Sequence, residues 1–370
     1  MNDIPTPPQA DDLSDSDEME IETDENEEEA LIEYDIASYP SDFTLDNLYS
    51  QWGKQSIIIP EFQREYVWTI EQASLLIDSF MLGLPVPPVF LYLDENSKYL
   101  VIDGQQRLLS VFFFFEGLFG KEEHGKRKVF KLTGLNEGVR YAGKTLKEFQ
   151  DDDRRKLEAS VLRAINIRQI SPSEQDTSVY HIFERLNTGG TPLKPQEIRN
   201  CVFSGKFVTI LKELNKEEYW RRIIGKQALD KHQKDVELVL RLFALIDESI
   251  SKYEKPMKEF LNRAMKRYRD GTSPNVQKFQ EGFRSTCKII IERLNDRPFH
   301  VRGPINAAYL DSIFCVIYNN LNRLPESLSG NYEKLKQDKD FNNKYTKGGT
   351  QDTNILKDRY QCAESILMAH

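Results

Sequence analysis

Two short apolar runs that lead into a polar, glycine-containing turn limit most strongly what this chain can fold into. Residues 89–93 and 99–102 are rich in aliphatic and aromatic side chains and are separated by the turn-forming residues 94–97. This pattern predicts a β-hairpin. The second run ends at Asp103-Gly104-Gln105-Gln106-Arg107, and the apolar stretch 108–119 predicts a buried helix. We therefore expect a strand, a tight turn and a helix in immediate succession.

Further elements are expected on both sides of this hairpin. Thr69 is typical of a helix N-cap and Gly83 of a helix end. The helix between them would bury one face formed by Leu75, Leu76, Phe80 and Met81. The pattern also predicts a helix over 44–52, a strand over 57–59 and a strand over 160–170.

From residue 173 onward the apolar spacing becomes helical. Val179, Ile182, Phe183 and Leu186 recur at the spacing of one helix face, and the same spacing returns from Val236 to Phe243. We therefore predict an α+β protein, in which an α/β domain is followed by a mostly α-helical domain. The predicted boundaries are a tail over 1–33, the α/β domain over 34–172 and the helical domain over 173–370.

Charge is distributed very unevenly along the chain. Residues 1–53 contain 17 Asp or Glu and no Lys or Arg, whereas the rest contains 50 basic and 42 acidic residues. An acidic stretch with few apolar side chains cannot offset the entropy of ordering, so we expect residues 1–33 to be disordered. The tail is either a solvating segment or an intramolecular mimic of nucleic acid that covers a basic groove. The basic remainder is compatible with phosphate or nucleic-acid contacts.

The sequence gives little support for a zinc protein, a redox enzyme or a membrane protein. The four cysteines and five histidines are isolated and lack the paired spacing of zinc or redox motifs, so we expect reduced thiols in or near the core. The apolar run 108–115 is interrupted by Ser110 and is much shorter than the roughly 20 residues that cross a bilayer. We expect a cytoplasmic protein without a membrane partner, or a nuclear one if the source is eukaryotic.

The turn 103–107 carries the residue types that phosphate binding needs. Backbone N–H groups at the start of a helix attract anions. Gly104 permits close backbone approach, Arg107 can form a charge-assisted fork with phosphate oxygens, and Asp103 can hold a metal ion or position a water. The alternative is purely structural: Asp103 as an N-cap, Gly104 as a turn residue, and the two glutamines facing solvent.

Three ordered motifs together resemble a known family. They are the stretch Ile59-Pro60-Glu61-Phe62-Gln63-Arg64-Glu65-Tyr66-Val67-Trp68, the stretch Val101-Ile102-Asp103-Gly104-Gln105-Gln106-Arg107-Leu108, and the stretch Phe183-Glu184-Arg185-Leu186-Asn187-Thr188-Gly189-Gly190-Thr191-Pro192-Leu193. The combination resembles the N-terminal domain family of GmrSD-type restriction endonucleases, which is related to ParB and sulfiredoxin. The resemblance implies that the α/β domain over 34–172 has a ParB/sulfiredoxin-like fold. The resemblance covers residues 40–205 closely and the helical remainder more loosely.

The resemblance implies binding and hydrolysis of a nucleoside triphosphate in defence against modified foreign DNA. It implies magnesium, with Asp103 as its ligand. The catalytic candidates are Asp103, Gln106 and Arg107. The nucleotide-binding candidates are Gln63, Arg64, Gly104, Gln105, Arg185, Asn187 and Thr188.

Two of these assignments have structural alternatives. Arg64 is either a phosphate contact or a structural residue, that is, a surface cation or a stacked partner of Tyr66 or Trp68. Asn187 and Thr188, followed by a glycine pair, either end a helix or form a loop that closes over the phosphates.

The sequence also departs from the wider group in two ways. Sulfiredoxin relatives use a cysteine that is missing between Asp103 and Arg107, which argues against reductase activity. After residue 205 we find no compact His, Asn and Asp set of the nuclease kind. We therefore expect a nucleotide-binding, NTP-hydrolysing protein that acts on DNA or with a separate nuclease subunit. The alternative is a non-catalytic nucleic-acid-binding or scaffold module, and a third reading is weak intrinsic nuclease activity.

Overall fold

The structure is a computed structural model, and its description covers most of the chain. The described residues are 19–22, 34–59, 66–94, 97–123, 126–136, 138–171, 178–186, 193–301 and 303–369, without the side chains of 22, 121–123 and 126. The chain divides into two compact units. The sheet unit is Leu31–Ser204, and the helical unit is Met1–Ala30 together with Gly205–His370.

A mixed five-stranded sheet forms the centre of the sheet unit, in the order β2-β8-β4-β5-β3. Its strands are β2 (Asp35–Thr44), β8 (Val161–Ser171), β4 (Val89–Leu93), β5 (Tyr99–Asp103) and β3 (Ile57–Ile58). β2 and β8 are antiparallel, as are β4 and β5, whereas β4 runs parallel to β8 and β3 to β5. The predicted hairpin and the predicted strand at 160–170 are confirmed.

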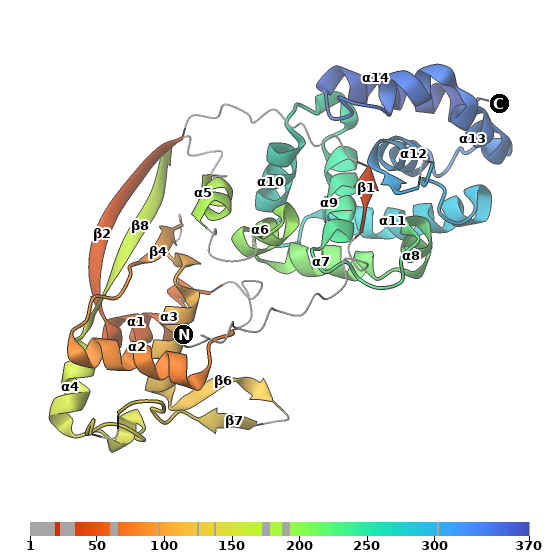
Figure 1. Ribbon diagram of the computed structural model, residues 1–370. Helices are drawn as coiled ribbons and strands as arrows, with labels where there is room; N and C mark the ends of the chain where they lie inside the picture. Colours follow the sequence, from red (N-terminus) through yellow and green to blue (C-terminus); the bar gives the residue numbers. More distant parts are fainter. Residues whose placement is uncertain are drawn as a thin grey trace, which may run out of the picture. The chain divides into compact units, whose positions relative to one another are not determined.

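Helices pack on this sheet or on one another and bury its apolar side chains. They are α1 (Leu45–Gly53), α2 (Ile70–Leu82), α3 (Gln105–Glu116), α4 (Asp151–Ala159), α5 (Ser178–Leu186) and α6 (Pro195–Val202), with the short 3-10 helix η2 (Leu146–Glu148) and the hairpin β6 (Leu118–Glu123) and β7 (Lys126–Val129). The aromatic residues Phe112, Phe114 and Phe130 are fully buried in the core of this unit. Figure 1 shows the long pair β2 and β8 and the helices of this unit.

The predicted ends of α2 are confirmed, but one of its predicted core residues is not. Thr69 forms a capping box with Gln72, and Gly83 ends the helix in the left-handed conformation. Leu75, which we expected on the buried face, is 52% exposed. It lies one position beyond the buried stripe that contains Leu76, Phe80 and Met81.

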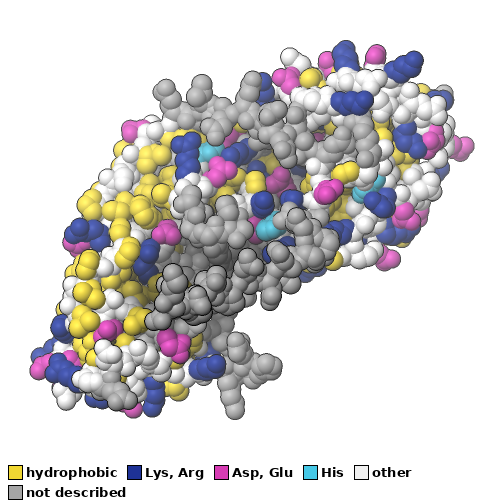
Figure 2. All heavy atoms as spheres, viewed as in Figure 1, with side chains coloured by type: hydrophobic (Ala, Val, Ile, Leu, Met, Phe, Trp, Pro, Cys, Tyr) yellow, Lys and Arg dark blue, Asp and Glu magenta, His cyan; other side chains and the backbone are white. Residues whose placement is uncertain are grey.

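Apolar side chains are also exposed on the two longest strands. Ile36 and Tyr39 on β2 and Val161 and Ile170 on β8 are each more than a third exposed. In Figure 2 hydrophobic atoms gather over this part of the sheet unit.

The helical unit confirms the prediction of a mostly α second half. Its helices are α7 (Lys206–Asn215), α8 (Glu218–Ile224), α9 (Lys234–Asp247), α10 (Met257–Arg267), α11 (Pro274–Leu294), α12 (Ala307–Asn319), α13 (Leu328–Gln337) and α14 (Thr353–Leu367), with the short η3 (Ile250–Lys252) and the π-helical turn η4 (Phe341–Tyr345). Two short strands, β1 (Ile21–Glu22) and β9 (Ile305–Asn306), pair in parallel within this unit.

Two predicted boundaries differ from the structure. The unit that contains the sheet ends at Ser204 and not at 172, because α5 and α6 pack on each other and α5 packs on β5. Within the predicted disordered tail, Met19–Glu22 is ordered against the helical unit, where Met19 is only 5% exposed. Residues 1–18 and 23–33 lie outside the described residues.

The structure shows where the cysteines lie and how long and apolar the helices are. All four cysteines lie within the described residues and none is part of a disulfide; Cys201, Cys287 and Cys315 are buried and Cys362 is partly exposed. Among the helices of the described residues, none combines the length and apolar character that a membrane span requires.

Candidate functional site

The candidate site is built on the turn that joins β5 to α3. Asp103 is the last residue of β5, Gly104 is the helix N-cap, and Gln105 begins the helix. The helix therefore starts three residues earlier than predicted, and its first turn is the polar Gln105-Gln106-Arg107. Because the N-cap is Gly104, without any side-chain cap bond, the structural alternative with Asp103 as the cap is wrong.

Gly104 is required at this turn by both its backbone and its surroundings. Its φ of +94° lies in the left-handed region, which side chains other than glycine rarely adopt. A Cβ added to it would lie 2.4 Å from Cγ1 and 2.9 Å from Cβ of the buried Val89 on β4. The close approach predicted for Gly104 is thus an approach to the neighbouring strand.

Arg107 and Asp103 form an ion pair across the first turn of α3. Nη2 of Arg107 lies 2.9 Å from Oδ2 of Asp103 and also donates to the carbonyl oxygen of Pro88 at 3.2 Å. The Arg107 side chain is 19% exposed and that of Asp103 45% exposed. Nε of Arg107 is buried and has no hydrogen-bond partner within the described part of the chain. The pair therefore places one largely buried cation beside one accessible carboxylate at the end of a strand.

Gln106 connects the second motif to the first. Its side-chain oxygen Oε1 accepts hydrogen bonds from the backbone N–H of Val67 at 3.0 Å and of Trp68 at 3.3 Å. Gln106 therefore holds the described end of the segment 59–68 against the start of α3. The alternative in which both glutamines face solvent does not apply to Gln106.

A second link between these motifs was missed by sequence reasoning. The hydroxyl of Tyr66 lies 2.8 Å from Oγ of Ser110, which donates to the carbonyl oxygen of Gln106 at 2.7 Å. Burial raises the pKa of Tyr66 to about 12, although the bond to Ser110 opposes this shift. The signal that could have found this link is Ser110 itself, the polar residue inside the apolar run 108–115.

The other candidates are distributed between exposed and undescribed positions. Gln105 is partly exposed, and Arg185 is exposed near the end of α5. Gln63, Arg64, Asn187 and Thr188 lie outside the described residues. The structure therefore brings together Asp103, Gly104, Gln106 and Arg107 with the end of the first motif, and it does not test the loop at 187–190.

Residues that follow the third motif are buried in α6. Arg199, at 2% exposure, lies with its guanidinium 5.6 Å from the ring centre of Tyr180 on α5. It also donates from Nη1 to Oε1 of Gln196 at 3.2 Å. These contacts fasten α6 to α5 within the sheet unit.

The strands and helices around the site lie in one continuous stretch of the chain, which matches a known family. Residues 45–204 match the model of the GmrSD restriction endonuclease N-terminal domain. This stretch is a GmrSD N-terminal domain. The match begins at the first residue of α1 and ends at Ser204, the last residue of the sheet unit. The GmrSD N-terminal domain therefore includes all three motifs, together with the helices α5 and α6.

Other comparisons add little to this assignment. A solved structure of a Pnob8-like ParB-N domain shares 13% sequence identity and has a TM-score of 0.23, with 91% of this chain and 100% of that chain covered. We draw no conclusion about fold or function from a likeness at this score. None of the curated proteins compared with the chain matches it.

Proposed function

We propose that this chain binds and hydrolyses a nucleoside triphosphate in a DNA-restriction or phage-defence system, with its nucleotide site at the β5–α3 turn of the GmrSD N-terminal domain. The observation that supports this most directly is the Arg107–Asp103 pair at the N-terminal end of α3. It combines a cation for phosphate oxygens with an accessible carboxylate, and phosphoryl transfer depends mainly on such positioning and charge stabilisation.

The start of α3 suits an anion for a second reason. The N-terminal end of a helix carries a partial positive charge. Gly104 brings no side chain that could cover it. Nη2 of Arg107 donates to Asp103 and to Pro88. A guanidinium has five N–H donors in all, so other donors of Arg107 are left for a ligand. It can therefore hold a phosphate without giving up its anchors.

In this proposal the site residues have different tasks. Arg107 stabilises the charge that develops on the transferred phosphate, and Asp103 orients the attacking water. Gln106, predicted as catalytic, is better assigned as a positioning residue, because its oxygen already holds the backbone of Val67 and Trp68. Gln63, Arg64, Gly104, Gln105, Arg185, Asn187 and Thr188 remain proposed nucleotide contacts.

Magnesium fits this site only as a companion of the nucleotide. Within the described ranges, no group of three or more His, Cys, Asp or Glu residues is arranged to hold a metal ion. Asp103 would thus supply one carboxylate, and phosphate oxygens and water would supply the remaining ligands, as magnesium commonly requires. Bound there, the ion would neutralise charge on the phosphates.

The proposed partners are DNA and a separate nuclease subunit, and the proposed location is the cytoplasm. The basic excess of the chain lies entirely in one part. Residues 205–370 contain 30 basic and 22 acidic residues, whereas residues 54–204 contain 20 of each. A DNA backbone contact is therefore expected within residues 205–370, since phosphate contacts are made by Lys and Arg.

The test is phosphate release from ATP, GTP and CTP with magnesium, with and without duplex DNA. We expect turnover by the native protein and a loss of roughly a hundredfold or more in Asp103→Asn, because one oriented charge at a phosphoryl-transfer site contributes about that much. Asp42→Asn is the matched control, because Asp42 forms an exposed ion pair with Arg163 elsewhere on the same sheet.

The two outcomes separate the two hypotheses. Turnover that is lost in Asp103→Asn and kept in Asp42→Asn supports a nucleotide-driven enzyme. If no nucleotide is turned over by the native protein, with or without DNA, the hydrolysis proposal fails. A steep decrease of DNA affinity with salt would then favour the alternative, a non-catalytic nucleic-acid-binding module.

A further inference from the structure

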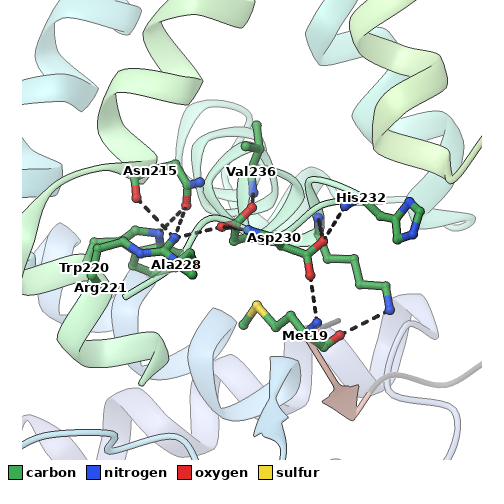
Figure 3. Close-up of polar contacts among 10 residues, drawn as sticks. Met19, Asn215, Trp220, Arg221, Ala228, Asp230, His232 and Val236 are labelled. Carbon is green, nitrogen blue, oxygen red and sulfur yellow. Dashed lines mark hydrogen bonds and ion pairs between the residues drawn. The ribbon is translucent and has the colours of Figure 1, made fainter. Parts of the chain in front are cut away.

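The segment Met19–Glu22 lies on the helical unit in the way that a bound peptide lies on its receptor. The backbone N–H of Met19 donates to Oδ2 of Asp230 at 2.7 Å, and Nζ of Lys234 donates to the carbonyl oxygen of Met19 at 3.2 Å (Figure 3). Both main-chain groups of Met19 are therefore bound by side chains more than 200 positions further along the chain.

The rest of the segment is held by strand pairing. Ile21 pairs with Ile305 and Glu22 with Asn306 in a parallel two-residue ladder. Along the segment the Met19 side chain is 5% exposed, Glu20 is exposed and Ile21 is half-buried. This combination of main-chain bonds with a buried anchor side chain is how an extended peptide is recognised when it adds to a sheet edge.

The receptor side is fixed from within the helical unit. Arg221 and Asp235 are both nearly fully buried and form an ion pair of 2.8 Å. Arg221 also donates to the carbonyl oxygen of Ala228, and the backbone N–H of Asp230 donates to Oδ2 of Asp235 at 3.0 Å. Figure 3 shows this network beside the docked Met19. The stretch from Ala228 to Asp230 is thus held in place by the buried Arg221–Asp235 pair, whose side chains do not contact the segment through any of these bonds.

One carboxylate oxygen of Asp230 accepts hydrogen bonds from its own loop and the start of α9, and the other accepts a hydrogen bond from the segment. Its Oδ1 accepts from the backbone N–H of His232 and of Lys234, at 3.0 and 3.1 Å. Its Oδ2 accepts from Met19, and the residue is 4% exposed. A buried carboxylate oxygen without a donor is costly, because it loses its hydration. With the segment in place, the backbone N–H of Met19 supplies the donor that this shielded oxygen needs.

Charge favours the same occupant. The segment lies within residues 1–53, which contain 17 acidic and no basic residues, whereas residues 205–370 have a basic excess of 8. The acidic segment therefore lies on a part of the chain, residues 205–370, whose net charge is opposite to its own.

We propose that the helical unit carries a docking site for an extended acidic peptide of the type Met-Glu-Ile-Glu, and that this chain's own residues 19–22 are its occupant. The occupant is recognised by its backbone and by the buried Met19 side chain, and the exposed Glu20 side chain is not required. The site is separate from the proposed nucleotide site and does not depend on it.

The experiment cuts the full-length protein between the segment and the rest of the chain. Residues 24–29 are replaced by a specific protease recognition sequence, the folded protein is cleaved, and gel filtration measures whether the N-terminal fragment remains bound. We expect the native fragment to co-elute with the body. Met19→Ala should release it, because most of the anchor's buried apolar surface is lost, whereas Glu20→Ala should retain it.

A peptide titration tests the same contacts with the substitutions placed in an added peptide. The folding of the protein is then the same in every measurement. Fluorescent peptides of residues 15–26, native or carrying Met19→Ala or Glu20→Ala, are added to the cleaved protein after its fragment has been exchanged away. We expect the Met19→Ala peptide to bind at least roughly tenfold more weakly than the other two. Separation of the native fragment on gel filtration, or equal affinity of all three peptides, would overturn the proposal.

Discussion

At the scale of single residues, Gly104 is the position in the candidate site where a substitution should be felt most. Its φ of +94° and the 2.4 Å approach to Val89 both oppose a side chain. We expect Gly104→Ala to lower the free energy of unfolding by about 2–4 kcal/mol, from left-handed strain and overpacking together. Denaturant titration of the protein measures this loss.

Gly83 provides the matched control for Gly104. It has φ of +70° at the end of α2, and an added Cβ would have nothing within 4 Å. Gly83→Ala should therefore cost only the left-handed strain, about 1–2 kcal/mol. Equal losses for the two variants would show that the contact with Val89 contributes nothing.

Sequence reasoning located some site residues and missed their partners for physical reasons. Asp103, Gly104 and Arg107 stood out because they are polar residues between an apolar strand and an apolar helix. Pro88, which accepts from Arg107, and Tyr66, which contacts Ser110, lie 19 and 44 positions away from those partners. Such pairings depend on the fold, and no local pattern contains them.

At the scale of elements, Gln106 connects α3 to the segment that leads into α2. Gln106→Ala leaves the N–H groups of Val67 and Trp68 without this acceptor, and we expect a loss of about 1–2 kcal/mol in unfolding free energy. Gln106→Glu keeps an acceptor oxygen and should retain the protection of both amides. Hydrogen exchange at Val67 and Trp68 measures the effect directly.

A glutamine with a purely local bond is the control for this experiment. Gln51 donates to Asn47 one turn earlier on the exposed side of α1, so Gln51→Ala should change stability by less than about 0.5 kcal/mol. Unchanged exchange at Val67 and Trp68 in Gln106→Ala would contradict the assignment of Gln106 as a positioning residue.

Element boundaries were harder to predict than the elements themselves. The apolar run placed α3 from residue 108, but the helix begins at Gln105 because its first turn is polar. The helices α5 and α6 show the same spacing of apolar residues as the later helices, so periodicity could not assign them to the sheet unit. That assignment depends on packing against β5, which no spacing reveals.

At the scale of the whole molecule, one buried carboxylate joins three helices of the helical unit. Oδ2 of Asp311 on α12 lies 2.6 Å from Nη2 of Arg241 on α9 and 3.8 Å from Nη2 of Arg359 on α14. All three side chains are at most 6% exposed. Burial lowers the pKa of Arg359 to about 10, although the charge of Asp311 opposes this shift.

Removal of this carboxylate should destabilise the helical unit strongly. We expect Asp311→Ala to cost about 3–5 kcal/mol, because it leaves two buried guanidinium groups without their shared counter-ion. Asp296→Ala, which removes an exposed partner of Arg222 in the same unit, should cost less than about 1 kcal/mol. Thermal or denaturant unfolding measures both, and similar costs for the two variants would be evidence against this role of Asp311.

The pairing of β1 with β9 has a consequence for the order in which the chain is made. The GmrSD N-terminal domain is encoded between the two parts of the helical unit. During translation the whole sheet unit is synthesised before the first residue of α7 is added, and domains generally fold as units in the course of synthesis. Residues 21–22 are synthesised early, but they cannot form their strand pairing until residues 305–306 have been made.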